Sequence, residues 1–200
     1  MGTTPRAFVL PAHVQDTPWI VWHRVRMVER LDEVTIRTAD EGDAESIARV
    51  HVRSWQEAYT GIVPEEHLAG LDPVDRTATW REHLRSATRD HMTTWVAEAP
   101  EHGLVGFATL GPARDEDAGR SDWEVYSIYL DPGTWGHGVA RELMRTVIGH
   151  AGTSRIYLWV LAENERARHF YRRHGFQADG VERYEQIGGA DLLEVRYVRG

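Results

Sequence analysis

Cysteine is absent from this chain of 200 residues, and so is lysine, so that all 23 basic residues are arginine. Without cysteine there is no disulfide framework, no thiolate zinc site and no cysteine nucleophile. The G-x-S-x-G turn that presents a serine nucleophile is missing as well. The sequence thus excludes covalent intermediates on either type of side chain.

Long apolar runs are also missing. None approaches the ~20 residues of a membrane span, and the start of the chain has no signal-peptide pattern, so we expect a cytoplasmic location. The formal net charge of −8 argues against a general nucleic-acid binder, which needs a basic face. An acidic chain suits a cationic amine better as a binding partner.

The chain has 11 histidines, but their spacing does not suit a metal site. His169 and His174 are five residues apart, not the three or four that place two side chains on one helix face. His83 and His91 are eight apart, which on one continuous helix separates them by ~12 Å along the axis. No H-E-x-x-H motif occurs, and we expect no bound metal.

The chain is long enough for one domain with an appendage. Residues 1–33 fall outside the pattern of the rest, with three early prolines followed by the apolar run PWIVWHRVRMV. We expect a poorly ordered leader. Two alternatives remain: an added strand through residues 19–28, or a leader that precedes a true start at Met27.

The rest of the chain alternates strand and helix patterns. A strand from Val34 is followed by a helix that Asp43 can cap and that runs to about Tyr59. Asp72 as the cap and Pro73 in the first turn open a second helix to about Arg85, and Asn164 can cap a short helix from Glu165 to His174. Residues 93–110 read as a hairpin.

Residues 122–151 are typical of a strand that ends in a turn and opens directly into a helix. Trp123 to Leu130 is aromatic and β-branched, and residues from Val139 onward repeat at helical spacing. Gly136 and Gly138 lie where this helix begins. Unpaired amides and the positive end of the helix dipole would attract a phosphate or pyrophosphate there.

Two common phosphate sites do not fit this turn. The Lys-Ser/Thr pair of an NTPase loop is missing, and so are the third glycine and the acidic residue of a dinucleotide fold. A tight turn without a ligand remains an alternative. Because the helix connects strand 123–130 to strand 155–160, a right-handed crossover would make these two strands parallel neighbours, with the remaining strands antiparallel.

A second motif, LWVLAENERARHFYRRHGF, spans residues 158–176. It resembles the C-terminal half of the GCN5-related N-acetyltransferase (GNAT) fold, where a strand leads to an asparagine, a short helix with alanine and tyrosine, and a Gly-Phe stop. The matching residues are Asn164, Ala167, Tyr171, Gly175 and Phe176. WGHGVA, residues 135–140, is similar to the acetyl-CoA pyrophosphate loop of the same family, although Trp135 replaces the usual Arg or Gln.

The resemblance covers residues 34–199 and implies the fold class: α/β (α+β), with a mixed, mostly antiparallel central sheet, a parallel splayed strand pair around a crossover helix, and helices on both faces. It implies acetyl-CoA as co-substrate. The residues that it assigns to the cofactor are Ile128, Tyr129, Leu130, Trp135, Gly136, His137, Gly138, Val139, Ala140, Asn164 and Tyr171.

Acetyl transfer to an amine needs a base, a stabilised oxyanion and a proton for the leaving thiolate. Glu124 is the candidate base, on a strand face predicted to include Tyr126, Ile128 and Leu130; an edge-of-strand surface glutamate is the alternative. Tyr171 is the candidate acid, and a core aromatic is the alternative. Main-chain amides near Ile128 or Leu130 would hold the oxyanion.

The acceptor is expected to contact Trp55, Tyr59 and Tyr126, with Glu124 and residues 60–66 nearby, since aromatic rings and a carboxylate together attract an ammonium. Trp55 is alternatively a core residue. The sequence thus predicts a direct-transfer N-acetyltransferase acting on a small amine or peptide, with a homodimer as a possible assembly. The alternatives are a non-catalytic acyl-CoA-binding module and an enzyme that modifies proteins or peptides.

Overall fold

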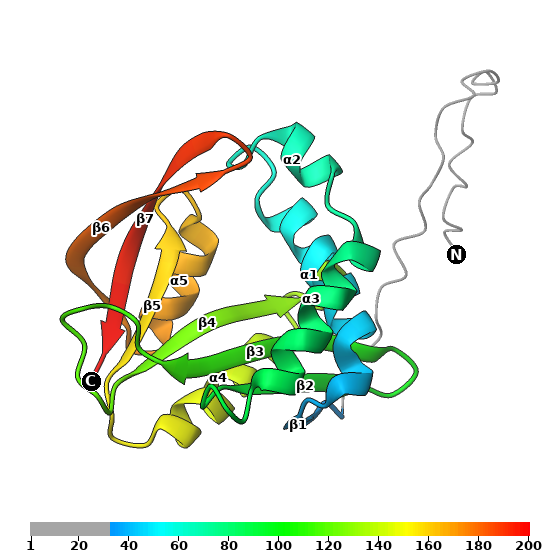
Figure 1. Ribbon diagram of the computed structural model, residues 1–200, viewed down its shortest axis with the longest axis horizontal. Helices are drawn as coiled ribbons and strands as arrows, with labels where there is room; N and C mark the ends of the chain where they lie inside the picture. The colour runs from blue at the N-terminus through cyan, green and yellow to red at the C-terminus, as the bar shows by residue number, and fades with distance from the viewer. Residues whose placement is uncertain (1–32) are drawn as a thin grey trace, which may run out of the picture.

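The computed structural model describes residues 33–200. A seven-stranded sheet runs through it in the order β1-β2-β3-β4-β5-β7-β6 (Figure 1). Only β4 and β5 are parallel, and every other neighbouring pair is antiparallel, as predicted. The strands are β1 (Thr35–Thr38), β2 (Thr93–Ala99), β3 (Gly103–Pro112), β4 (Trp123–Leu130), β5 (Ile156–Leu161), β6 (Gln177–Ile187) and β7 (Ala190–Arg199).

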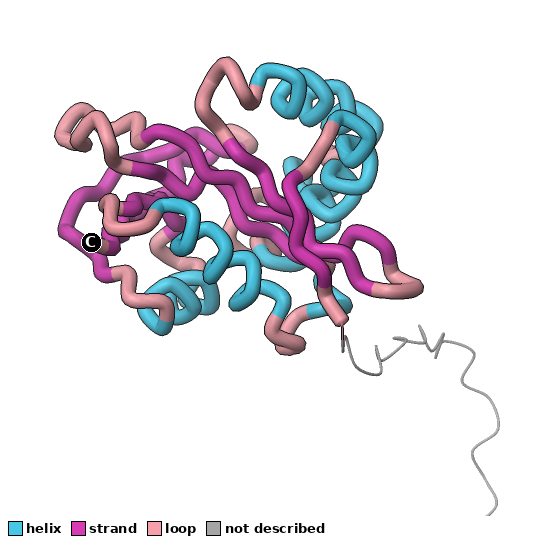
Figure 2. Tube along the Cα trace, turned by 90° about the horizontal axis from the view of Figure 1, so that it is seen from below, coloured by secondary structure: helices cyan, strands magenta, loops and turns pink. Residues whose placement is uncertain are grey.

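Helices cover both faces of the sheet, which confirms the predicted fold class (Figure 2). On one face α1 and α3 pack over Val96 and Phe107, and on the other α4 and α5 pack over Val125 and Leu158. The helices are α1 (Ala44–Ala58), α2 (Glu65–Ala69), α3 (Pro73–Ser86), α4 (Val139–Ala151) and α5 (Glu165–Arg173), with 3-10 turns at η1 (Glu41–Asp43) and η2 (Pro132–Thr134). Helix α2 lies between the two helices predicted on either side of it and was not itself predicted from the sequence.

The three interpretations of the N-terminal segment, namely a leader, an added strand and a start at Met27, concern residues 1–32, which lie outside the described residues. None of the helices in residues 33–200 combines the length and the apolar character needed to cross a membrane.

Two of the three predicted helix caps are confirmed. The side chain of Asp72 accepts from the amide of Val74 at 2.8 Å, and that of Asn164 accepts from the amide of Ala167 at 3.0 Å. Asp43 was expected to cap α1 but makes no side-chain bond to an amide of that helix. Its carboxylate instead binds Arg37 through two 2.7 Å contacts and accepts from the amide of Asp40 at 2.9 Å, which closes the capping box of η1.

A β-bulge in β4 changes which side chains share a face. Thr109 of β3 lies opposite Ser127, but the next residue, Leu110, lies opposite Val125, so Tyr126 is the extra residue. One extra residue reverses the alternation of side chains along the strand. Val125 therefore packs in the same core cluster as Ile128 and Leu130. The predicted common face of Glu124, Tyr126, Ile128 and Leu130 is wrong.

Beyond the bulge, β4 and β5 separate. They pair at only three positions, from Trp123 with Ile156 to Val125 with Leu158. β4 stays paired with β3 as far as Leu130, and β5 stays paired with β7 as far as Leu161. The sheet thus opens into a wedge between its two halves (Figure 1). One backbone edge of β4 faces that wedge without a strand partner.

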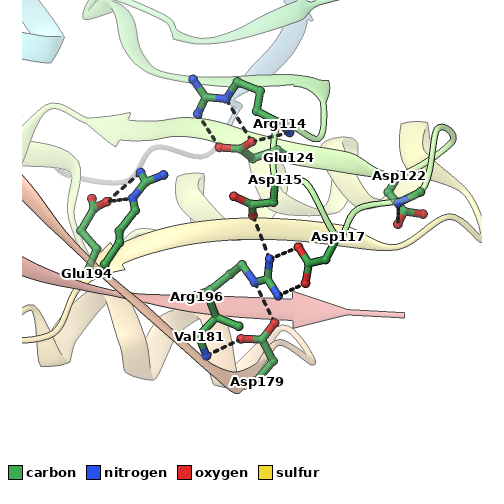
Figure 3. A network of polar contacts seen from close by, with 11 residues as sticks. Arg114, Asp115, Asp117, Asp122, Glu124, Asp179, Val181, Glu194 and Arg196 are labelled. Carbon is green, nitrogen blue, oxygen red and sulfur yellow. Dashed lines mark hydrogen bonds and ion pairs between the residues drawn. The ribbon is translucent and has the colours of Figure 1, made fainter.

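Arg196 of β7 ties the β3–β4 loop to the second half of the sheet (Figure 3). Although it is only 4% exposed, its guanidinium binds Asp115 at 3.1 Å, Asp117 at 2.6 Å and Asp179 at 2.8 Å. A buried guanidinium that pairs with three carboxylates holds all three in fixed positions, because losing one partner would leave a buried charge unbalanced. The loop is therefore fixed next to the paired end of β4 and β5, where Arg114 reaches Glu124.

His51 of α1 lies among the aromatic side chains between α1, α3 and the sheet. Its Nδ1 accepts a hydrogen bond from Trp80 Nε1 at 3.1 Å, and its ring stacks on that of Tyr129 with centroids 5.0 Å apart. Burial, followed by the charge of Arg76, lowers the pKa of His51 to about 4. His51 is therefore neutral at neutral pH.

We expect acid to destabilise the fold through His51. Because its pKa is lower in the folded protein than the ordinary value of 6.5, the unfolded chain takes up the proton first as the pH falls. The free energy of unfolding should fall from about pH 6.5 toward pH 4, by at most roughly 3 kcal/mol from this group.

Urea unfolding across this pH range, with wild type beside His51→Asn, checks the expectation. Asparagine keeps an oxygen for Trp80 but takes up no proton. The variant should be less stable at neutral pH and lose less stability in acid. Parallel pH curves for the two proteins would show that another group titrates.

Candidate active site

A cleft of about 1190 Å³ opens where β4 and β5 separate. It brings together residues that are far apart in the sequence, from α1, β4, the β4–α4 loop, β5, α5 and the β6–β7 hairpin. All the predicted site residues except His137 line it: Trp55, Tyr59, Glu124, Tyr126, Ile128, Tyr129, Leu130, Trp135, Gly136, Gly138, Val139, Ala140, Asn164 and Tyr171.

The loop before α4 has the geometry of an anion cradle. Gly136 and Gly138 have φ values of +85° and +87°, in the left-handed region that side chains with a Cβ rarely adopt. Among residues 33–200, the amides of Gly136, Gly138 and residues 139–141 find no acceptor, and the first bonded amide of the helix is that of Glu142, to Gly138 O at 3.2 Å. These free donors lie at the positive end of the α4 dipole, which favours an anion.

The turn that carries this loop is held on both sides. The Asp131 carboxylate accepts from the amide of Gly133 at 3.0 Å and pairs with Arg53 of α1 at 2.7 Å. Trp135 Nε1 donates to Leu130 O at 3.3 Å, which fixes the indole against the end of β4. His137 is exposed, and its Nδ1 lies 3.0 Å from Trp135 O. The His137 side chain thus stays outside the cleft.

Tyr171 of α5 lines the cleft from its buried side. Its ring contacts Phe170, Phe176 and Tyr197, with centroids 5.5 to 6.4 Å apart. Burial raises the pKa of Tyr171, so the phenol stays protonated at neutral pH. Its hydroxyl makes no hydrogen bond within residues 33–200. The group is therefore a neutral donor without a protein acceptor.

Glu124 is a buried residue, only 2% exposed, so it is not a surface glutamate. Its carboxylate binds Arg114 through the backbone amide at 3.2 Å, through Nε at 3.1 Å and through a short contact with Nη2 (Figure 3). The hydrogen bond to Glu124 raises the pKa of Arg114. The Arg114 guanidinium also lies 4.2 Å from the centroid of the Tyr126 ring. The Glu124 carboxylate is thus paired with Arg114 at the edge of the cleft.

The acceptor end of the cleft is covered by two segments. Val63 and Leu68, around α2, pack against Leu161 of β5 together with Ile187 and Leu192 of the β6–β7 hairpin. Trp55 and Tyr59 of α1 lie on the same cluster, with their rings 4.9 Å apart. Trp55 and Tyr59, two of the residues predicted to contact the acceptor, thus line the cleft at this end.

Sequence reasoning missed the contribution of the second half of the sheet. Arg183 lies 4.1 Å from the centroid of the Trp159 ring and binds Glu194 at 2.7 Å, and all three residues line the cleft. Their pattern is that of ordinary strands. No local signal distinguishes them, because their place in the cleft depends on the order of strands in the sheet.

Two arginines were also missed. Arg114 was not singled out because its partner Glu124 is ten positions away across a loop. Arg166, in the first turn of α5, lies with its guanidinium carbon 3.5 Å from the centroid of the Trp135 ring. It lines the same cleft as the glycine loop. The local signal for Arg166 was only its place two residues after the Asn164 cap.

Comparison with known proteins agrees with this geometry. Residues 50–176 match the profile of the acetyltransferase (GNAT) family. The chain is 31% identical over 166 residues to the uncharacterized N-acetyltransferase YuaI of Bacillus subtilis, an alignment that covers 81% of this chain and 90% of the relative.

Solved structures have the same architecture. The ribosomal-protein-alanine N-acetyltransferase from Brucella melitensis superposes with a TM-score of 0.64 at 26% identity, covering 82% of this chain and 98% of that one. The PaiA N-acetyltransferase from Thermoplasma acidophilum, in complex with coenzyme A, superposes with a TM-score of 0.63 at 20% identity, covering 84% and 98%. With the family profile, a relative along most of the chain and the same fold in agreement, this protein belongs to the GNAT family and is an N-acetyltransferase.

Proposed function

We propose that the protein transfers an acetyl group from acetyl-CoA directly to the primary amine of a small molecule. The observation that carries this proposal is the set of free amides at Gly136 and residues 138–141, beside a wedge between parallel strands. A related fold, that of the PaiA enzyme, holds coenzyme A. The acetyl thioester of acetyl-CoA supplies the activated acyl group. The residues of the cleft bind, orient and exchange protons.

The loop amides bind the diphosphate of the donor through its negative charge, as helix N-termini do in general. The unpaired edge of β4, at Ile128 and Leu130, offers main-chain groups to the amide groups of the pantetheine arm. The same edge provides an amide for the carbonyl oxygen on which negative charge develops. Binding and oxyanion stabilisation are thus both main-chain functions.

Glu124 is the proposed base, directly or through a water molecule. Because the Arg114 side chain is 62% exposed, it can turn toward solvent when the ammonium of the acceptor takes its place on the carboxylate. Glu124 then takes the proton, and the neutral amine attacks the thioester carbonyl. As the new C–N bond forms and the C–S bond breaks, Tyr171 donates its phenolic proton to the thiolate, and the remaining surplus proton of the amide nitrogen passes to the phenolate, directly or through water, which restores the phenol.

The closed acceptor end favours a small amine over a protein. The α2 segment and the β6–β7 hairpin meet over it, with a glycine at the hairpin tip packed against His67. A peptide terminus remains the second candidate, because a related fold belongs to an enzyme named for modifying an alanine of a ribosomal protein. Trp55, Tyr59 and Tyr126 are the proposed contacts of the acceptor, through cation–π attraction to its ammonium.

A panel of amines tests the proposal: polyamines, aminoglycosides, amino acids and peptides, each assayed for thiol release from acetyl-CoA. Turnover with a small amine and none with peptides would support it. Turnover with peptides alone would favour the second candidate. Binding of coenzyme A without thiol release from any amine would indicate a non-catalytic acyl-CoA-binding module.

Gly138→Ala should weaken coenzyme A binding, because alanine is strained at the φ of +87° that shapes the cradle. The expected loss is about tenfold in Kd by calorimetry, or about 1.4 kcal/mol. Gly180→Ala is the matched control, since Gly180 has a φ of +89° with open space around it and lies on β6, away from the loop. Equal affinity for the two variants would count against the cradle.

Tyr171→Phe should lower kcat by about tenfold or more, because it removes the proton donor and leaves the ring in place. KM for acetyl-CoA should change little. Tyr157→Phe, at a buried tyrosine outside the cleft, serves as the control. Steady-state kinetics with both substrates varied give the comparison, and an unchanged kcat for Tyr171→Phe would remove its assigned role.

Glu124→Gln should abolish the acidic limb of the pH profile of kcat/KM, since that limb reports protonation of the base in the free enzyme. The rate at the optimum should fall by roughly 100-fold. Glu98→Gln, which alters an ion-paired carboxylate of β2 remote from the cleft, is the control. If the Glu124→Gln profile keeps the wild-type limb, the base is another group.

A further inference from the structure

Trp135 and Arg166 form a pair at the mouth of the anion cradle. The Trp135 indole is fixed by its hydrogen bond to Leu130 O, and the Arg166 guanidinium is stacked 3.5 Å from the ring centroid. Stacking on tryptophan is the strongest form of cation–π contact, and it leaves the N–H groups at the edge of the guanidinium free. Trp135 immediately precedes Gly136, so it holds the Arg166 cation next to the glycine loop.

Arg166 lacks an anionic partner in the described part of the chain. Two other arginines of α5, Arg168 and Arg172, both bind Glu165. Arg141, in the first turn of α4, is paired with Glu142 at 3.1 Å. Within residues 33–200, no carboxylate lies within 4.0 Å of the Arg166 guanidinium; burial, the larger effect, lowers the pKa of Arg166, and the charge of Glu57 raises it from farther away. The stacked guanidinium is therefore available to an anionic ligand in the cleft.

The position of Arg166 indicates which anion this is. Arg166 lines the same cleft as Gly136, Gly138 and Ala140, and it touches the residue next to Gly136 in the chain. The free amides of the cradle carry only partial charges, whereas a diphosphate diester carries two full negative charges. The cradle alone therefore leaves charge unbalanced, and Arg166 is a cation beside it.

We propose that Arg166 is a diphosphate-binding residue of this enzyme, held in place by Trp135 and acting from α5 opposite the amides of the α4 loop. The inference rests on the proposed use of acetyl-CoA. It adds a charged, side-chain contact to a site otherwise made of main-chain amides. It also assigns a role to Trp135, as the platform that positions the guanidinium before the donor binds.

Calorimetry with three probes tests the inference: coenzyme A, 3′-dephospho-coenzyme A, and pantetheine, which has no phosphate. Arg166→Ala should weaken the binding of the first two by the same factor, about 10- to 100-fold. Pantetheine should lose less than about twofold. Arg166→Lys should recover only part of the affinity, because an ammonium neither stacks flat nor donates through a fork.

Arg145→Ala is the matched control, since Arg145 is an exposed arginine of α4 outside the cleft, and it should leave all three affinities unchanged. Thermal unfolding with each variant checks that the fold is retained. The inference is overturned if Arg166→Ala binds coenzyme A as wild type does, if the loss occurs only with the 3′-phosphate present, or if pantetheine loses as much. Failure of wild type to bind coenzyme A would instead contradict the proposed function.

Discussion

The separation of β4 from β5 is the constraint on which the rest of this structure depends. Two parallel strands that pair at only three positions leave the remaining backbone edge of β4 without a strand partner. Buried main-chain groups need partners, so such an edge is stable only beside solvent or a ligand. The bulge at Tyr126 lies where the pairing stops. It turns Ile128 and Leu130 to the α4 face while Glu124 stays on the other.

Arginine pairs organise the walls of this wedge. Arg196 fixes the β3–β4 loop through three aspartates, and that loop in turn carries Arg114 to Glu124 (Figure 3). On the opposite side of the cleft, Arg183 of β6 pairs with Glu194 of β7. Bidentate guanidinium contacts resist rearrangement better than single contacts do. The paired arginines thus define the cleft, and Arg166, which lacks a carboxylate partner in residues 33–200, is available to a ligand.

The predictions that succeeded depended on short-range geometry. The turn glycines before α4, the caps at Asp72 and Asn164, and the parallel pair around the α4 crossover all follow from residues within one or two elements. Those that failed depended on competition between distant partners. The Asp43 carboxylate binds Arg37 and makes no bond to an amide of α1. No periodicity in residues 123–130 indicates the extra residue of a bulge.

By itself the sequence determined most of the helices and strands, the glycine turn before α4 and the tyrosine that follows Asn164, because backbone conformation and helix ends respond to neighbouring residues. Only the tertiary structure decided that Glu124 is held by Arg114, that β6 and β7 complete the cleft, and that Arg166 rests on Trp135. These contacts depend on strand order, register and the direction of side chains across the wedge. Such quantities are set by the packing of the whole sheet and not by any local run of residues.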